Sequence, residues 1–227
     1  MTNQFGFYSL IFCIVFVIFS IYFSSSSLLN KQKIFSKNIF ISISLQLFFA
    51  ILSFVSLVIA FVSSDFSNVT VYNNSHTLKP LFYKFSGVWG NHEGSLLLWL
   101  LVLILFLFIF TLNSRKIQDR YKLFTIIFQE FIILGFLFFI ILTSNPFEVL
   151  VPTPEEGLGL NPILQDPALA IHPPILYIGY VGTSLIFSSS LAANVCNKVN
   201  NEWANHIKKW IITSWIFLTL GIMLGSI

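Results

Sequence analysis

Residues 94–112 read GSLLLWLLVLILFLFIFTL and contain no charged side chain. A helix needs about 20 mostly apolar residues to cross the hydrocarbon core of a bilayer, so this stretch predicts a transmembrane helix. Five further stretches share its apolar character: Phe5–Phe23, Asn38–Val62, Leu123–Thr143, Pro174–Ala193 and Trp210–Ile227. We therefore expect an all-α, polytopic membrane protein with about six transmembrane helices, because a backbone in lipid must satisfy its own hydrogen bonds.

The composition supports a membrane protein and argues against a nucleic-acid-binding role. Charged residues make up 9% of the chain, against about 25% in soluble domains, and hydrophobic residues make up 56%. The net charge of +3 is too small and too dispersed for a nucleic-acid surface. The chain has 27 phenylalanines and only two methionines. This usage indicates an AT-rich coding sequence from an organelle or a low-GC bacterium.

Basic residues are distributed unevenly between the connections, which predicts the orientation. Ten lie between the first and second, third and fourth, and fifth and sixth stretches, and two lie elsewhere. Lysine and arginine concentrate on the inner side of a membrane, so both termini and the connections 63–93 and 144–173 are expected outside. Residues 1–227 are expected to form a single transmembrane domain. The ten are Lys31, Lys33, Lys37, Arg115, Lys116, Arg120, Lys122, Lys198, Lys208 and Lys209; the two are Lys79 and Lys84.

Residues 88–95, VWGNHEGS, form the first polar motif, which runs into the apolar stretch. Asn91 is expected to cap that helix, and Glu93 to lie in its first turn, where the helix dipole favours a carboxylate. The simplest interpretation is a capped helix with Trp89 at the membrane interface. A metalloprotease site is excluded, because the motif H-E-x-x-H needs a second histidine where Leu96 stands.

Residues 160–174, LNPILQDPALAIHPP, form the second motif. A residue that precedes proline is disfavoured in the α region, so His172 is expected in an extended or turn conformation, with a helix starting at Pro173 or Pro174. The imidazole would then be held at the outer membrane surface, where a neutral ring is a suitable axial ligand for haem iron. A histidine that only marks an interfacial turn is the alternative. Asp166 either orients the ring through a hydrogen bond or starts a helix.

Three other ionisable residues stand apart from these motifs. Glu130 lies well inside the stretch 123–143, and acids within a membrane are functional candidates. A structural ion pair with a basic residue of the inner connection and a proton relay are both open for it. His76 and His206 are expected to be solvated residues in connections.

Both motifs resemble the CcmF family, the haem lyase subunit of the System I cytochrome c maturation pathway of bacteria and many mitochondria. Matching segments recur in family order at residues 64–67, 79–84, 89–99, 143–148, 161–180 and 214–226. The resemblance implies a subunit that handles haem at the outer face for covalent attachment to a C-x-x-C-H apocytochrome c. Whether the chain is itself an enzyme stays open, because activity is expected to need a partner chain.

In that family two external histidines flank a Trp-rich segment, the WWD region, and hold haem, while two histidines within the membrane bind a resident b-type haem. The first external histidine matches His172, so the resemblance implies that His172 is an axial ligand of the substrate haem b. The sequence stops at Ile227, where the family's chain enters the WWD region. We therefore expect a split CcmF, in which a separate chain carries this region, the other haem histidines and the resident haem. Residues implied to support the haem site are Asp166, Pro173, Pro174, Trp89, His92 and Glu93.

The resemblance also implies the other partners and the location. The partners are a CcmE-like haem carrier, an apocytochrome c, a CcmH-like thiol-handling subunit and the lipid bilayer. The mitochondrial inner membrane is expected, with the bacterial plasma membrane as the alternative. Lys79 and Lys84 would meet either a haem propionate or lipid headgroups. The alternative function is a structural or transport subunit of a larger membrane complex, with Glu130 as its buried acid.

Overall fold

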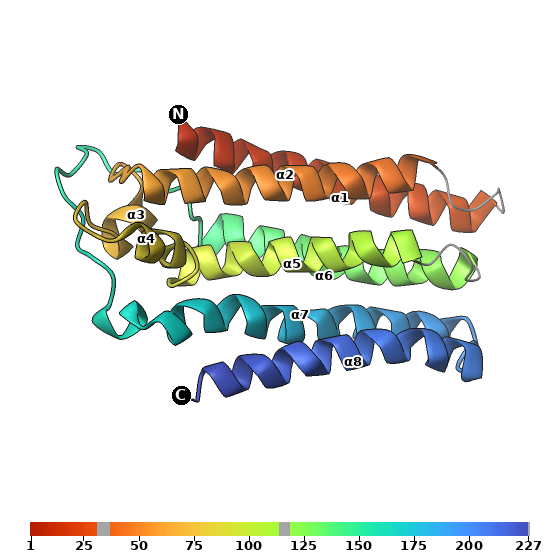
Figure 1. Ribbon diagram of the computed structural model, residues 1–227. Helices are drawn as coiled ribbons and strands as arrows, with labels where there is room; N and C mark the ends of the chain where they lie inside the picture. Colours follow the sequence, from red (N-terminus) through yellow and green to blue (C-terminus); the bar gives the residue numbers. More distant parts are fainter. Residues whose placement is uncertain (31–36, 114–118, 227) are drawn as a thin grey trace.

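Six long helices lie side by side in the computed structural model, which describes residues 1–30, 37–113 and 119–226 (Figure 1). They are α1 (Thr2–Asn30), α2 (Lys37–Val62), α5 (His92–Asn113), α6 (Asp119–Thr143), α7 (Pro167–Val195) and α8 (Asn201–Leu224). Each is long and apolar enough to cross a membrane. In the described part of the chain, β structure is limited to an isolated bridge between Asn68 and Val149. The expected all-α fold with six transmembrane helices is confirmed.

The helices form three hairpins, and the hairpin of α5 and α6 lies between the other two (Figure 1). α1 packs along α2 and α7 packs along α8, while α6 contacts both α1 and α7. α5 is the most buried of the six helices, and its side chains Leu100, Leu103 and Leu107 belong to the core. α8 is the least buried and contacts mainly α7. The core therefore follows α5, and α8 forms one edge of the bundle.

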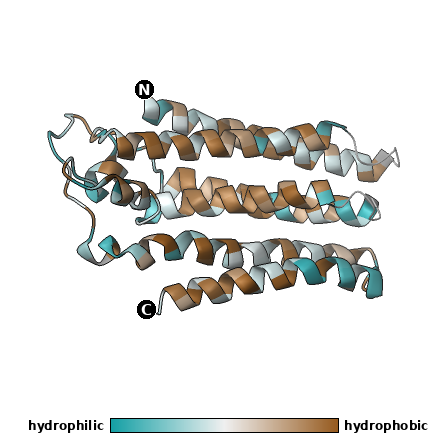
Figure 2. Ribbon diagram, viewed as in Figure 1, coloured by the Kyte–Doolittle hydropathy of each residue, from teal (hydrophilic) through white to brown (hydrophobic). Residues whose placement is uncertain are grey.

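Polar residues gather at the two ends of the bundle, and apolar residues cover its length (Figure 2). Both termini lie at the end that carries the two long connections, with the short helices α3 (Val69–Asn74) and α4 (Leu81–Gly87) and the 3-10 turn Pro162–Gln165. This arrangement agrees with an even number of crossings, and which end faces inward stays a prediction. The predicted inner residues Lys31, Lys33, Arg115 and Lys116 lie outside the described residues.

Asn68, in the first long connection, forms hydrogen bonds with the N-terminal segment and with the second long connection. Its side-chain oxygen caps α3 by accepting from Val71 N at 2.9 Å. Its amide nitrogen donates to Asn3 Oδ1 at 2.8 Å and to Pro146 O at 2.9 Å. Asn68 is fully buried, so these bonds satisfy polar groups that water does not reach. The two connections thus form one packed layer over this end of the helices.

α7 begins earlier than the sequence predicts, because its start has a complete capping signal. Asp166 is the N-cap, and its Oδ1 accepts from the backbone N–H groups of Ala168 at 2.8 Å and Leu169 at 3.1 Å. Pro167 occupies the first helical position, where a missing N–H costs no helical hydrogen bond. Asp166 and Pro167 together favour a helix more strongly than Pro173 disfavours α geometry at His172.

His172, Pro173 and Pro174 consequently lie inside α7, so the predicted extended or turn conformation of His172 is wrong. A proline inside a helix lacks the N–H that would bond the carbonyl four residues earlier. For Pro174 that carbonyl belongs to Ala170, and it accepts instead from the indole Nε1 of Trp89 at 2.8 Å. The indole thus replaces the missing backbone donor and joins the start of α5 to α7.

Trp89→Phe should destabilise the protein by about 1–3 kcal/mol, because it leaves the Ala170 carbonyl without its donor. Pro174→Ala restores a backbone N–H that can donate to the Ala170 carbonyl. The free energy of unfolding of the double variant should therefore fall by less than the sum of the decreases in the two single variants. Thermal unfolding of the detergent-solubilised protein measures these losses. Trp215→Phe is the control, because the Trp215 side chain is 64% exposed on α8. Strictly additive losses would contradict the replacement of one donor by the other.

The orientation can be tested with the native Cys196, which caps α7 at the end of the bundle opposite the termini (Figure 1). A membrane-impermeant maleimide should modify Cys196 from the inner side only, as the basic connections predict. Cys13 is buried and should stay unmodified. Leu78→Cys in a Cys196→Ser background should react from the outer side only, since Leu78 is exposed in the first long connection. Labelling of Cys196 from the outer side, or of the cysteine at position 78 from the inner side, would contradict the predicted orientation.

Candidate functional site

His172 lies in the N-terminal half of α7, and its half-buried imidazole faces α8. The ring Nδ1 lies 2.6 Å from the carbonyl oxygen of Gly221. A carbonyl only accepts hydrogen bonds, so Nδ1 carries the proton and donates it. The neutral ring then has its lone pair on Nε2, which is the nitrogen that can bind a metal in this tautomer. α8 therefore sets both the orientation and the tautomer of His172.

Glycines on α8 make this approach possible. A Cβ atom on Gly221 would lie 2.7 Å from Leu176 Cα, and one on Gly225 would lie 2.6 Å from His172 Cε1. The first contact is with the backbone of α7 and leaves no room for a side chain, whereas the second is with the imidazole ring, which would have to move. Small residues are what lets membrane helices approach this closely. The sequence interpretation missed the contact, although the G-x-x-x-G spacing of Gly221 and Gly225 is a signal for it.

Asp166 and Trp89 shape the start of α7 and do not bond the imidazole in the described structure. The Asp166 carboxylate takes the second of its two expected roles, starting the helix, and the bond that orients the ring comes from α8. The Trp89 indole bonds the carbonyl of Ala170, one half-turn before His172. The structure thus places His172 and Pro173–Pro174 on one stretch of α7, which the Trp89 indole contacts at the Ala170 carbonyl.

The start of α5 follows the sequence prediction. Asn91 Oδ1 accepts from Gly94 N at 2.7 Å and so caps the helix. Glu93 lies in the first turn, where the positive end of the helix dipole favours its charge.

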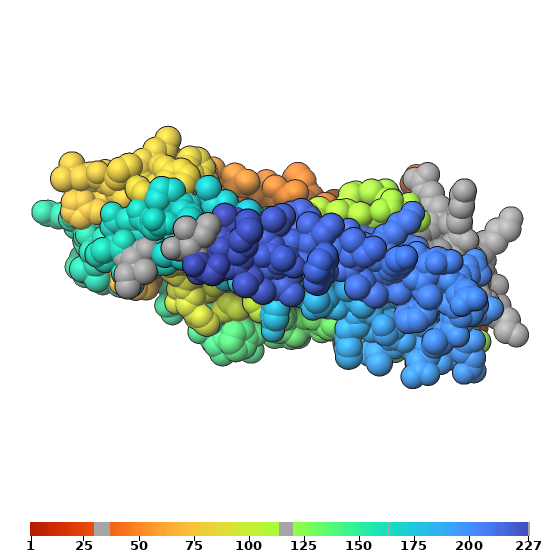
Figure 3. Space-filling view, turned by 60° about the horizontal axis from the view of Figure 1, so that its bottom comes forward, coloured from red at the N-terminus to blue at the C-terminus, as the bar shows by residue number. Residues whose placement is uncertain are grey.

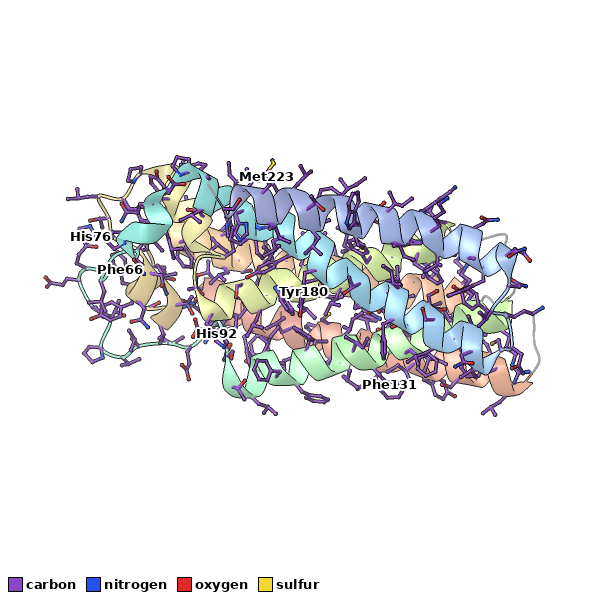
Figure 4. All side chains as sticks on the ribbon, turned by 90° about the horizontal axis from the view of Figure 1, so that it is seen from below. Phe66, His76, His92, Phe131, Tyr180 and Met223 are labelled. Carbon is purple, nitrogen blue, oxygen red and sulfur yellow. The ribbon has the colours of Figure 1, made fainter. Side chains whose placement is uncertain are left out.

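His92 lies on a different side of the bundle from His172. Its Nε2 is 3.0 Å from Ser144 Oγ, just beyond the end of α6. Figure 4 shows His92 beside α6, away from Met223 near the end of α8. The structure therefore places the two predicted histidines against different helices, and no hydrogen bond in the described part of the chain joins them.

Lys79 and Lys84 are held within the first long connection. Lys79 Nζ donates to Asn74 O at 3.0 Å, and Lys84 Nζ donates to Ser64 Oγ at 2.6 Å. Burial lowers the pKa of Lys79 to about 8, and the nearby charge of Lys84 adds to this shift. Both ammonium groups thus have partners within the protein.

His76 is more than a solvated loop residue, because it faces the second connection. Its Nε2 lies 3.8 Å from Glu156 Oε2. Hydrogen bonds from the Thr77 hydroxyl and from backbone N–H groups hold the pKa of Glu156 at about 2. The pair lies on the exposed side of the layer formed by the two connections.

Glu130 is fully buried between α1, α2 and α6. Its Oε1 accepts from Gln46 Nε2 at 2.9 Å, and the same nitrogen donates to the Phe16 carbonyl at 3.1 Å. No lysine or arginine pairs with Glu130 in the described part of the chain, so the ion pair considered for it is not formed there. The sequence interpretation missed Gln46, an amide that interrupts the apolar stretch 38–62.

His206 lies in α8, so its prediction as a solvated residue of a connection is wrong. Asn200 caps the helix by accepting from Trp203 N at 2.9 Å, which starts α8 earlier than its apolar residues indicate. The imidazole packs against Phe110 of α5, with ring centroids 5.9 Å apart.

A haem is a ligand that the arrangement at His172 fits. In residues 1–30, 37–113 and 119–226, no three His, Cys, Asp or Glu side chains gather around a metal position. An axial haem ligand requires only a single side chain from the protein, because the porphyrin nitrogens occupy the plane. His172 offers such a nitrogen in a fixed ring.

Comparisons with known proteins show the family of the chain. Residues 89–227 match the family described as cytochrome C assembly protein. The chain is 51% identical over 174 residues to the cytochrome c-type biogenesis protein CycK of Rhizobium meliloti (strain 1021), an alignment that covers 77% of this chain and 26% of that protein. It is 44% identical over 182 residues to CcmF of Pseudomonas aeruginosa, covering 80% of this chain and 28% of that protein.

A solved structure of the cytochrome c heme lyase CcmF shares the fold. The TM-score is 0.82 at 21% sequence identity, over 97% of this chain and 35% of that chain. The chain thus spans about a quarter of the length of the curated relatives. The family match extends over most of the chain, from the Trp89 motif through α8, and the relatives named above align over more than three quarters of it. The chain therefore belongs to the cytochrome c assembly protein family.

Proposed function

We propose that the chain is the part of a cytochrome c haem lyase that holds substrate haem b at the outer membrane surface, with His172 as an axial ligand. The carrying observation is the bond from Nδ1 to the Gly221 carbonyl, because it leaves the lone pair on Nε2. The relatives are named cytochrome c-type biogenesis proteins, which supports the same role.

In this proposal the chain positions and orients the haem for the reaction of its vinyl groups. Thioether formation adds a thiol to a haem vinyl group: the sulfur bonds one vinyl carbon and the thiol proton goes to the other, so the addition itself needs no oxidant. A fixed imidazole limits where the vinyl groups lie relative to an incoming thiol, and such positioning is a large part of catalysis in bimolecular steps. Trp89, Asp166 and Pro173–Pro174 support the site by fixing the start of α7. His92 and Glu93 are more remote supports, since they order the neighbouring start of α5.

We further propose that residues 1–227 form one transmembrane domain of a split CcmF, completed by a separate chain. That chain would carry the WWD region, the remaining haem histidines and the resident haem. Figure 3 shows α8, in blue, across the face turned to the reader. The apolar side chains Ile211, Trp215 and Ile216 of α8 are exposed and offer a surface for partner helices. A CcmE-like haem carrier, an apocytochrome c and a CcmH-like thiol-handling subunit complete the proposed set of partners.

The mitochondrial inner membrane is the proposed location, on the basis of the AT-rich composition. The relatives named above are bacterial, which supports the bacterial plasma membrane as the alternative. A structural or transport role is the second candidate function, because the buried Glu130–Gln46 pair has no part in the His172 site. Haem optical spectra of the purified assembly distinguish the two functions, since only the first requires bound haem.

His172→Ala should reduce covalent cytochrome c haem, measured by haem stain and normalised to the assembled complex, by more than about tenfold. His172→Asn is the matched variant, because its amide can still donate to the Gly221 carbonyl but has no nitrogen lone pair for iron. It should lose haem stain equally while keeping the complex assembled. His92→Ala should leave most of the stain. Normal staining in His172→Ala or His172→Asn would show that the imidazole is structural.

A photo-cross-linking residue at Trp215 should capture a Trp-rich polytopic chain, because the partner is proposed to cover α8. The same probe at Ile59, which is exposed on α2 at the opposite edge of the bundle, is the control. Mass spectrometry identifies the captured chain. Purification of an active assembly without such a chain would refute the split arrangement.

A further inference from the structure

A groove of about 580 Å³ runs along the bundle between α5 and α8, and Ile178 of α7 also lines it. Its amide and ionisable side chains are Asn113, His206 and Lys209, and the hydroxyl of Thr213 lies further along α8. Its apolar lining includes Phe106, Trp210 and Phe217. No part of the His172 site lines it, so the groove is separate from the proposed haem position.

The amide and ionisable residues of the groove gather at one end. Asn113 is the last residue of α5, and His206 and Lys209 lie in the first half of α8. Both positions belong to the end of the bundle opposite the termini (Figure 1). From His206 to Phe217 the helix rises about 16 Å, which matches one leaflet of a hydrocarbon core about 30 Å thick. The groove therefore extends from a membrane interface to near the bilayer centre.

The polar end carries a cation without an acidic partner. No carboxylate forms an ion pair with Lys209 in the described part of the chain, although Glu202 lies two turns earlier on the same helix. His206 Nε2 is shielded from solvent and has no hydrogen-bond partner among the described residues. A lipid phosphate at this end would pair with the Lys209 ammonium group, and a small turn of the His206 ring would let its unpartnered nitrogen join the contact, which is favourable because a buried polar atom without a partner is costly.

We propose that this groove binds one anionic phospholipid, with its phosphate at Lys209 and His206 and one acyl chain along Phe106, Trp210 and Phe217. Basic pockets between transmembrane helices on the inner side are suited to acidic headgroups. The length of the groove matches an acyl chain in one leaflet better than it matches a compact ligand. The charge at its end selects an acidic lipid over a zwitterionic one.

The test uses the full assembly in nanodiscs and follows the tryptophan fluorescence. The probes are phosphatidylglycerol and phosphatidylcholine with brominated acyl chains, which quench a tryptophan only on contact. The difference between the wild-type protein and Trp210→Phe isolates the Trp210 signal from the other tryptophans of the assembly, four of which lie in this chain. Phosphatidylglycerol should quench Trp210 at about fivefold lower mole fraction than phosphatidylcholine, a preference of the size that one lysine near a membrane surface provides.

Lys209→Gln should remove the preference for phosphatidylglycerol. Lys208→Gln is the matched control, because it removes the same charge from the neighbouring residue, which does not line the groove. It should keep most of the preference. Equal quenching by the two lipids in the wild-type protein would overturn the proposal. Absence of quenching at Trp210 by either lipid would also overturn it, because a haem or a partner helix would then occupy the groove.

Discussion

A backbone carbonyl that is buried in a protein needs a hydrogen-bond donor, and this constraint explains how the His172 region is built. A helix that contains two consecutive prolines leaves backbone carbonyls without their usual donors. One of them, on Ala170, is satisfied by the indole of Trp89. The Gly221 carbonyl, which already accepts the helical bond from Gly225 N at 3.1 Å, gains a second donor in His172. Two side chains thus bond the backbone of neighbouring helices and fix how these helices meet.

The proposed haem site depends on α7 and α8 lying closer together than ordinary side chains permit. Without that approach the imidazole would not reach a backbone carbonyl, and its tautomer would be unspecified. The residues that make it possible, Gly221 and Gly225, have no chemistry of their own. The proposed site is therefore one reactive side chain held by backbone geometry, and the partner chain is proposed to supply the remaining ligands.

Sequence reasoning predicted the parts of the molecule that depend on local properties. The six apolar stretches, the cap at Asn91 and the place of Glu93 follow from composition and from capping rules, and the structure agrees with them. It failed where two local signals compete, as at the start of α7, where Asp166 and Pro167 prevail over the bias at His172. It also could not pair residues distant in the sequence, such as Gln46 with Glu130, because such a pair depends on how the helices are arranged.

The tight contact at Gly225 also limits how the gene can change. Every single-base substitution that alters a glycine codon introduces a side chain or a stop, and even the Cβ atom of alanine at this position would lie 2.6 Å from the His172 ring. The phenylalanine content indicates a coding sequence under mutational drift toward A and T. Such drift converts glycine codons to those of serine, arginine, aspartate, glutamate, valine, cysteine or tryptophan, or to a stop. Each of these side chains would displace the His172 ring from its place beside α8, so Gly225 affects the proposed ligand although the residue touches haem in no part of the proposal.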